Sequence, residues 1–276
     1  MVPFTGVPNC PLGDHASKIL LLLLFFSAWV EPAQAQQPDP PTTAVSALEN
    51  FARRWSVSDH PQPTAAPLPP TPQADKVVYL TFDDGPDPRW TPEIVKLLKA
   101  YQAQATFFVL GRSVVSNPTV IKQAAEAGQF FGNHSFNHTA LGYVGFSTFS
   151  AEVNDTAYYL KAAVEDEPEL LSQITPCLRP PYGETSPSLY QNASALGMWV
   201  TLWTIDTEDW KNPDPSEVIQ AVVEKVKPGD VILMHDGGEK RENTIKSLAL
   251  VLHELSQRGY GFAPMCTSAG LADALR

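Results

Sequence analysis

Short apolar runs alternate with amphipathic segments from Lys76 onward, and this pattern predicts an α/β fold. Apolar runs of about 4–8 residues are typical of buried strands, and longer segments with apolar positions three or four apart are typical of helices. Strands are predicted at 77–82, 105–110, 199–205, 231–234 and 261–265. Helices are predicted at 91–101, 118–127, 147–165, 188–196, 215–226 and 243–258. Strands that alternate with helices indicate parallel pairing.

The N-terminal quarter of the chain has a different pattern. An apolar run at 19–30 follows Lys18 and precedes Ala33 and Ala35. The run is shorter than the roughly 20 residues that a membrane-spanning helix needs. We therefore predict a secretory signal peptide over 1–35, with an uncleaved anchor as the alternative. The Pro-rich stretch 36–75 is predicted to be a mostly disordered linker.

Export would place the mature protein outside the cell or in the cell envelope, with no stable membrane span after cleavage. The chain carries a formal charge of −11, which argues against a nucleic-acid binder, and is 43% hydrophobic, which argues against a wholly disordered chain. Cys10 would leave with the signal peptide. Cys177 and Cys266 could then form a disulfide or remain two separate buried thiols.

Polar and charged residues follow several of the strand-like runs. Asp83 and Asp84 come after the first run, and Arg179, Asp206 and His235 each follow a later apolar run. Each group alone also fits an ordinary turn or strand end. Because the carboxyl ends of parallel strands meet at one edge of a sheet or barrel, where ligands bind, we expect these residues to lie together.

Two histidines are spaced as metal ligands often are. His134 and His138 lie four residues apart, so both imidazoles can reach one cation from one face of a helix or across a turn. Two partly exposed histidines at a helix cap are the alternative.

Five segments together resemble the polysaccharide deacetylase family, which is also called the NodB-homology or carbohydrate esterase family 4 domain. They are TFDDGP (81–86), HSFNH (134–138), RPPYG (179–183), DTEDW (206–210) and LMH (233–235). Each motif alone is weakly to moderately specific, but all five in order are strongly specific. The resemblance covers about 77–275 and implies a distorted (β/α) barrel with about seven parallel strands. It makes 76–276 the catalytic domain.

The resemblance also implies the metal site. Asp84, His134 and His138 would bind a divalent metal, with Zn²⁺ as the default and Co²⁺, Ni²⁺ or Mn²⁺ as alternatives. Asp83 would be the general base, and Arg179 would pair with it and keep it ionised.

Further roles follow from the same resemblance. His235 would be the general acid, with Asp206 raising its pKa. The backbone N–H of Tyr182 would stabilise the oxyanion, and Trp210 and Leu233 would form an apolar wall around the acetyl methyl group.

The implied activity is hydrolysis of N-acetyl groups in polysaccharides that contain N-acetylglucosamine, such as peptidoglycan or chitin, by a monomer. An O-acetyl esterase of acetylxylan with the same site is the alternative. A non-catalytic carbohydrate-binding relative and a structural envelope protein with a vestigial site are further alternatives. A serine esterase is disfavoured because the sequence has no Gly-x-Ser-x-Gly elbow.

Overall fold

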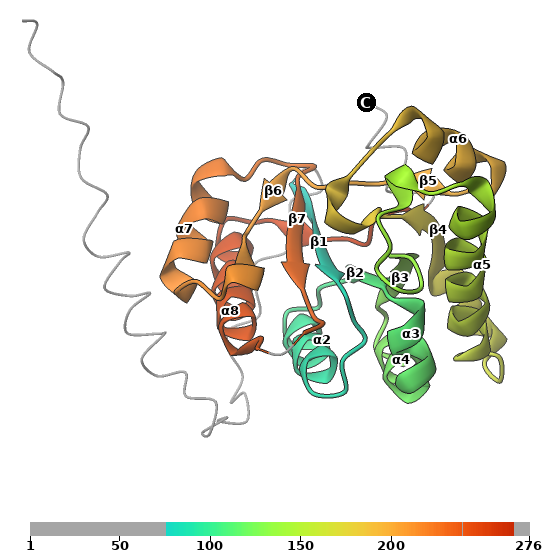
Figure 1. Ribbon diagram of the computed structural model, residues 1–276. Coiled ribbons are helices and arrows are strands. Elements are labelled where there is room, and N and C mark those ends of the chain that lie inside the picture. Colours follow the sequence, from blue (N-terminus) through green and yellow to red (C-terminus); the bar gives the residue numbers. More distant parts are fainter. Residues whose placement is uncertain (1–75, 239, 268–276) are drawn as a thin grey trace, which may run out of the picture. The chain divides into compact units, whose positions relative to one another are not determined.

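The computed structural model describes residues 76–238 and 240–267 (Figure 1). The predicted signal peptide over 1–35 and the predicted linker over 36–75 lie outside the described residues. No helix within the described ranges is long and apolar enough to cross a bilayer.

A parallel sheet forms the centre of the fold, and seven of its strands follow one hydrogen-bonded path, β5-β4-β3-β2-β1-β7-β6. The strands are β1 Val77–Asp83, β2 Ala105–Val109, β3 Phe130–Asn133, β4 Ile174–Leu178, β5 Trp199–Val200, β6 Ile205–Asp206 and β7 Val231–His235. The short strand β8 (Gly261–Phe262) pairs with the beginning of β1. The predicted α/β fold with parallel strands is confirmed.

Helices surround the outer side of the sheet (Figure 1). They are α2 Trp90–Ala100, α3 Gly111–Ser116, α4 Pro118–Glu126, α5 Phe146–Ala162, α6 Pro187–Ala195, α7 Pro215–Lys225 and α8 Glu242–Gln257. The six predicted helices all form, with ends that differ by a few residues. Helix α3 was not predicted.

The predicted strand over 199–205 is wrong as a single element. Its first two residues form β5 at one edge of the sheet, and Ile205 begins β6 at the other edge. The four residues between them connect the two edges. Thr201 donates its N–H to the Leu178 carbonyl, and Thr204 donates its N–H to the Val231 carbonyl. Because so short a segment links the two edges, the sheet is curled into a half-barrel. The linking segment 201–204 resembles part of a strand because its sequence continues the apolar pattern of β5.

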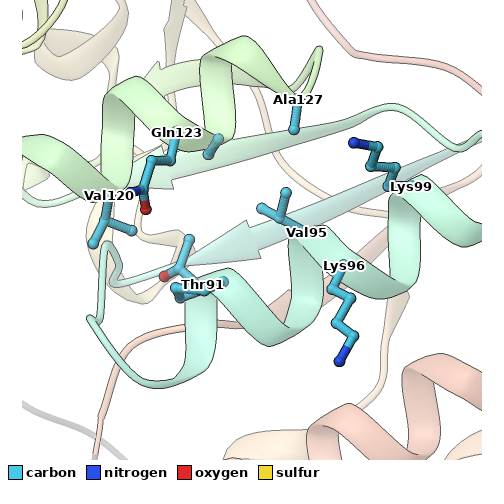
Figure 2. A pocket seen from close by; sticks show the side chains of 9 residues that line it. Thr91, Val95, Lys96, Lys99, Val120, Gln123 and Ala127 are labelled. Atoms are coloured by element: carbon cyan, nitrogen blue, oxygen red, sulfur yellow. The ribbon is translucent and has the colours of Figure 1, made fainter. Parts of the chain in front are cut away.

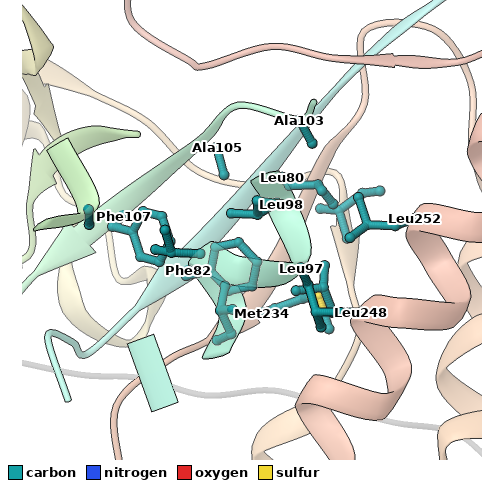
Figure 3. Close-up of a cluster of buried hydrophobic side chains, with 14 of the residues drawn as sticks. Leu80, Phe82, Leu97, Leu98, Ala103, Ala105, Phe107, Met234, Leu248 and Leu252 are labelled. Atoms are coloured by element: carbon teal, nitrogen blue, oxygen red, sulfur yellow. The ribbon is translucent and has the colours of Figure 1, made fainter. Parts of the chain in front are cut away.

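Alternation along the strands gives the sheet two different faces. Leu80, Phe82 and Met234 point outward and pack with α2 and α8 in the main hydrophobic core, which Figure 3 shows. Thr81 and Asp83 point to the inner face, where both accept hydrogen bonds from the buried side chain of Arg179. The outer face therefore supplies stability, at about 1.5–3 kcal/mol per fully buried large apolar side chain, and the inner face is free to carry polar groups.

A disulfide joins Cys177 of β4 to Cys266, which follows β8, with a Cα–Cα distance of 6.0 Å. Both cysteines pack against Phe108 on the inner face. Of the two alternatives that the sequence left open, the structure therefore has the disulfide. It holds the segment after β8 against the base of the polar site.

Candidate active site

The carboxylates of the first motif lie where β1 ends. Asp83 is the last residue of the strand, and Asp84 follows it with a left-handed φ of 76°. The next residue, Gly85, donates its N–H to Asp236 Oδ1 at 3.1 Å. A Cβ at Gly85 would overlap the Asp236 carboxylate, so only glycine fits there.

Asp236, which follows His235, is a buried carboxylic acid to which no role of its own was assigned from the sequence. Its second oxygen accepts a hydrogen bond from Thr91 Oγ1 of α2 at 2.5 Å. Burial raises the pKa of Asp236 to about 7, and the nearby charges of Asp84 and Asp83 act in the same direction. Asp236 therefore connects β7, α2 and the turn that carries Asp84.

Asp84, His134 and His138 form a cluster whose ligand atoms all lie within 4.8 Å of one another. Asp84 Oδ1 lies 3.6 Å from His134 Nε2 and 3.3 Å from His138 Nε2. This oxygen is buried and has no hydrogen-bond partner among the described residues. One carboxylate, with an oxygen that lacks a hydrogen-bond partner, and two imidazoles fit a divalent cation that keeps open coordination positions.

The tautomer of His134 also suits a metal ligand. Its Nδ1 lies 2.7 Å from the carbonyl oxygen of Arg179, and a carbonyl can only accept, so Nδ1–H is the donor. Nε2 then carries the lone pair toward Asp84. Burial lowers the pKa of His134 to about 3, so the imidazole is neutral. Metal-ligating histidines are commonly oriented in this way.

Arg179 is fully buried and bonded to Asp83. Its Nη1 donates to Asp83 Oδ1 and to Thr81 Oγ1, both at 2.8 Å, and its Nη2 donates to the Leu202 carbonyl at 3.0 Å. The guanidinium also lies 4.0 Å from the centre of the Phe108 ring. The predicted Arg179–Asp83 pair therefore forms. Burial raises the pKa of Asp83 by more than Arg179 and His235 lower it, which favours proton uptake by this carboxylate.

His235 is paired with Asp209, not with Asp206. Its Nδ1 lies 2.7 Å from Asp209 Oδ1, and Asp209 Oδ2 accepts hydrogen bonds from Thr244 Oγ1 at 2.7 Å and from the His235 N–H at 3.0 Å. Burial alone would lower the pKa of His235, but Asp209 and the more distant Asp83 and Asp84 raise it. The prediction that Asp206 raises this pKa is therefore wrong.

Backbone geometry explains why Asp209, and not Asp206, pairs with His235. Asp206 ends β6 in register with Leu233, and its exposed carboxylate accepts the N–H of Glu208 at 2.8 Å. Glu208 has a left-handed φ of 52°, which reverses the chain so that Asp209 points back toward His235. Both acids are in the DTEDW motif, so the motif contained the correct residue without identifying it.

The remaining predicted residues differ in exposure. Tyr182 is 65% exposed, and its ring meets the edge of the His138 ring with centroids 4.5 Å apart. Trp210 is 53% exposed, whereas Leu233 is only 3% exposed and lies two residues before His235 on β7. Trp210 can therefore offer an indole face to a ligand, whereas Leu233 lies beneath the surface.

A separate cavity of about 280 Å³ lies between α2 and α4 (Figure 2). Aliphatic side chains such as Val95 and Val120 line it, together with Lys96 and Lys99. It contains none of the predicted site residues. We assign no chemistry to this cavity.

The polysaccharide deacetylase family profile matches residues 71–201. A peptidoglycan-N-acetylglucosamine deacetylase of Bacillus cereus is 36% identical over 203 residues, which are 73% of this chain and 92% of the relative. This chain belongs to the polysaccharide deacetylase family. A chitooligosaccharide deacetylase of Bradyrhizobium is 30% identical, with 68% of this chain and 88% of the relative covered.

Solved structures of the family agree with this assignment. The solved structure of the peptidoglycan deacetylase PdaC of Bacillus subtilis matches with a TM-score of 0.63 and 30% identity, covering 73% of this chain and 92% of the solved chain. The predicted NodB-type barrel and the predicted enzyme class, a polysaccharide deacetylase, are therefore confirmed.

Proposed function

We propose that this chain hydrolyses N-acetyl groups of N-acetylglucosamine-containing polysaccharide and releases acetate, leaving a free amine on the sugar. One observation carries the proposal. The metal-ligand cluster (Asp84, His134 and His138), the Asp83–Arg179 pair and the His235–Asp209 pair all gather at the carboxyl edge of one sheet. Relatives named for action on peptidoglycan and on chitooligosaccharides support the substrate class.

The metal-ligand cluster would hold a divalent ion, with zinc as the first candidate and cobalt, nickel or manganese as alternatives. Such an ion supplies Lewis-acid activation of water and of the amide carbonyl. Asp83 is next to the cluster, with Oδ2 3.8 Å from His134 Nε2. Arg179 holds the other oxygen, Oδ1. Oδ2 is therefore the atom that takes the proton of the attacking water.

His235 completes the reaction as the general acid. Asp209 holds Nδ1, so Nε2 is the atom that donates a proton. The water oxygen bonds to the acetyl carbon, the C–N bond breaks, and the departing nitrogen takes the proton from His235. The products are acetate and the sugar amine. Asp209 replaces Asp206 in the role of keeping His235 protonated.

Three residues would position the substrate. The Tyr182 backbone, held at a φ of 64° before Gly183, would direct its N–H toward the developing oxyanion. The exposed indole of Trp210 would stack on a sugar ring. Leu233 would form the floor beneath the acetyl group.

The place of action is part of the proposal. A signal peptide over 1–35 and a linker over 36–75 would deliver the catalytic domain to the cell envelope or the medium as a monomer, where its polymeric substrates are found. The Cys177–Cys266 disulfide supports an oxidising compartment.

Acetate release by the purified chain tests the proposal. Chitooligosaccharides, peptidoglycan and acetylxylan are assayed in parallel, with chelator and after zinc is added back. We expect zinc-dependent release from an N-acetylated glycan. Release from acetylxylan alone would replace the amide substrate with an ester, and no release by a zinc-loaded chain would refute the proposed activity.

A further inference from the structure

The loop that carries the second histidine has a backbone that needs support. Ser135 and His138 have left-handed φ values of 66° and 65°. Non-glycine residues adopt this conformation at a free-energy cost and keep it only where their surroundings hold it. The loop between the two histidines must therefore be fixed by contacts from elsewhere in the fold.

Glu152 of α5 makes those contacts. Its Oε2 accepts the backbone N–H groups of Phe136 and Asn137, both at 2.8 Å. Its Oε1 accepts from Asn137 Nδ2 at 3.1 Å and from Thr139 Oγ1 at 2.8 Å. These donors lie on both sides of His138 in the chain. The side chain is almost fully buried, and all four bonds go to this one loop.

A second contact fixes the loop to the same helix. Asn133 accepts the N–H of Ser135 on Oδ1 at 2.9 Å and donates from Nδ2 to the carbonyl of Val153 at 2.9 Å. Two adjacent residues of α5 therefore hold the start and the end of the loop. The sequence separates Glu152 from the loop by more than a dozen residues, and no motif includes it.

The two histidines are positioned by different means. His134 is oriented through its own ring, because Nδ1 donates to the Arg179 carbonyl. The ring of His138 contacts Asp84 and the rings of His134 and Tyr182. Within the described residues, no carbonyl holds the His138 ring as the Arg179 carbonyl holds His134, so the position of His138 depends on the backbone that Glu152 holds.

We infer that Glu152 is a positioning residue that sets the affinity of the metal-ligand cluster by holding the backbone before His138 and the Thr139 side chain after it. This inference rests on the proposed metal site. Partners that orient ligands typically change metal affinity by about 10–100-fold when they are removed. Glu152 touches no substrate and takes no part in proton transfer.

Zinc affinity is the measurement that tests this inference. Metal-free wild type, Glu152→Ala, Glu152→Gln and Asp155→Ala are titrated with zinc against a chromophoric chelator. Asp155 is an exposed acid one helical turn further along α5, so Asp155→Ala is the matched control. Thermal unfolding of each metal-free variant shows whether the fold itself has changed.

We expect Glu152→Ala to bind zinc about 10–100-fold more weakly, and Asp155→Ala to bind like wild type. Glu152→Gln keeps one acceptor oxygen, and the side chains of Asn137 and Thr139 can reverse their donor and acceptor roles, so the loss should stay within about threefold. Deacetylation by Glu152→Ala should recover as zinc is raised. A merely structural role would lower the unfolding temperature without changing zinc affinity.

Wild-type zinc affinity in Glu152→Ala would overturn the inference, and so would an equal loss in Asp155→Ala. A wild-type chain that binds no divalent metal would overturn both the inference and the metal site. A wild type that binds zinc but releases no acetate from any glycan would refute the proposed function alone, while weak zinc binding by Glu152→Ala would still support the positioning role.

Discussion

The metal-ligand cluster and the His235–Asp209 pair lie at the same edge of the sheet but differ in how their polar atoms are satisfied. In the pair, both Asp209 oxygens accept hydrogen bonds of 2.7 Å, one of them from His235 Nδ1. In the cluster, Asp84 Oδ1 is buried without a hydrogen-bond partner, 3.3 Å from His138 Nε2. The pair is complete within the protein, whereas the cluster is the part that a cation would complete.

Asp83 lies between these two regions. Its Oδ2 is 3.8 Å from His134 Nε2 of the cluster, and the charge of His235 lowers its pKa from the other side. Arg179 fixes its remaining oxygen. A change at Asp83 should therefore abolish the chemistry while leaving both neighbouring regions in place.

Asp83→Asn should have the largest effect. The amide oxygen can still accept from Arg179, but the side chain can no longer take a proton, so kcat should fall by about 100–10,000-fold. The zinc titration described above is the control and should show the cluster still able to bind. Turnover near the wild-type rate with zinc bound would refute Asp83 as the base.

Asp209→Asn should have a smaller but more distinctive effect. Without the carboxylate, the pKa of His235 falls, so the protonated acid is lost at lower pH. The alkaline limb of kcat/KM against pH should move toward lower pH, and kcat should fall by about 10–100-fold. Zinc affinity should not change, because Asp209 bonds His235 and Thr244 and none of the three metal ligands.

Asp206→Asn is the matched control for this change. Its carboxylate accepts the Glu208 N–H in an exposed turn, and an amide oxygen can do the same. Its pH profile should match that of wild type. An unshifted alkaline limb in Asp209→Asn, or a shift in Asp206→Asn, would contradict the assignment of Asp209 as the partner of His235.

The sequence predicted the site better where it depends on strand ends than where it depends on turns. Asp83, Arg179 and His235 follow strands or strand-like runs, and parallel pairing brings such ends to one edge. Asp209 could not be chosen over Asp206 from the motif, because the left-handed φ of Glu208 decides which acid turns back.

Strands β3 and β4 and the role of Glu152 were not predicted, because each depends on packing that the local sequence pattern does not show. Strand β3 is only four residues long and contains Gly132, whose missing side chain makes room for Phe108 beneath Arg179. Strand β4 contains Pro176, which breaks the apolar pattern. Glu152 is found only by packing, because its partners are distant in sequence.

Asp236→Asn should have the smallest effect on turnover and a clear effect on how stability depends on pH. Asp236 supports the turn that carries Asp84, through Gly85 N–H and Thr91 Oγ1. An asparagine can keep both bonds, because its oxygen accepts from Gly85 and its amide can donate to the Thr91 hydroxyl. The substitution therefore removes the titratable group while leaving the turn in place.

The direction of this pH dependence follows from the pKa of Asp236, which is about 7 in the folded protein and 3.8 when the group is not surrounded by the fold. Between pH 4 and 7 the folded state keeps a proton that the unfolded state has lost, so stability falls as pH rises, by about 1.4 kcal/mol per unit. The metal-free wild type should lose roughly 4 kcal/mol across this range through this group, and Asp236→Asn should not. Urea unfolding at pH 4.5, 6 and 7.5 measures the difference. Parallel pH dependence in the two proteins would show that Asp236 does not titrate in this range. The turn beneath the metal-ligand cluster would then hold no buried group that changes its protonation on unfolding between pH 4 and 7.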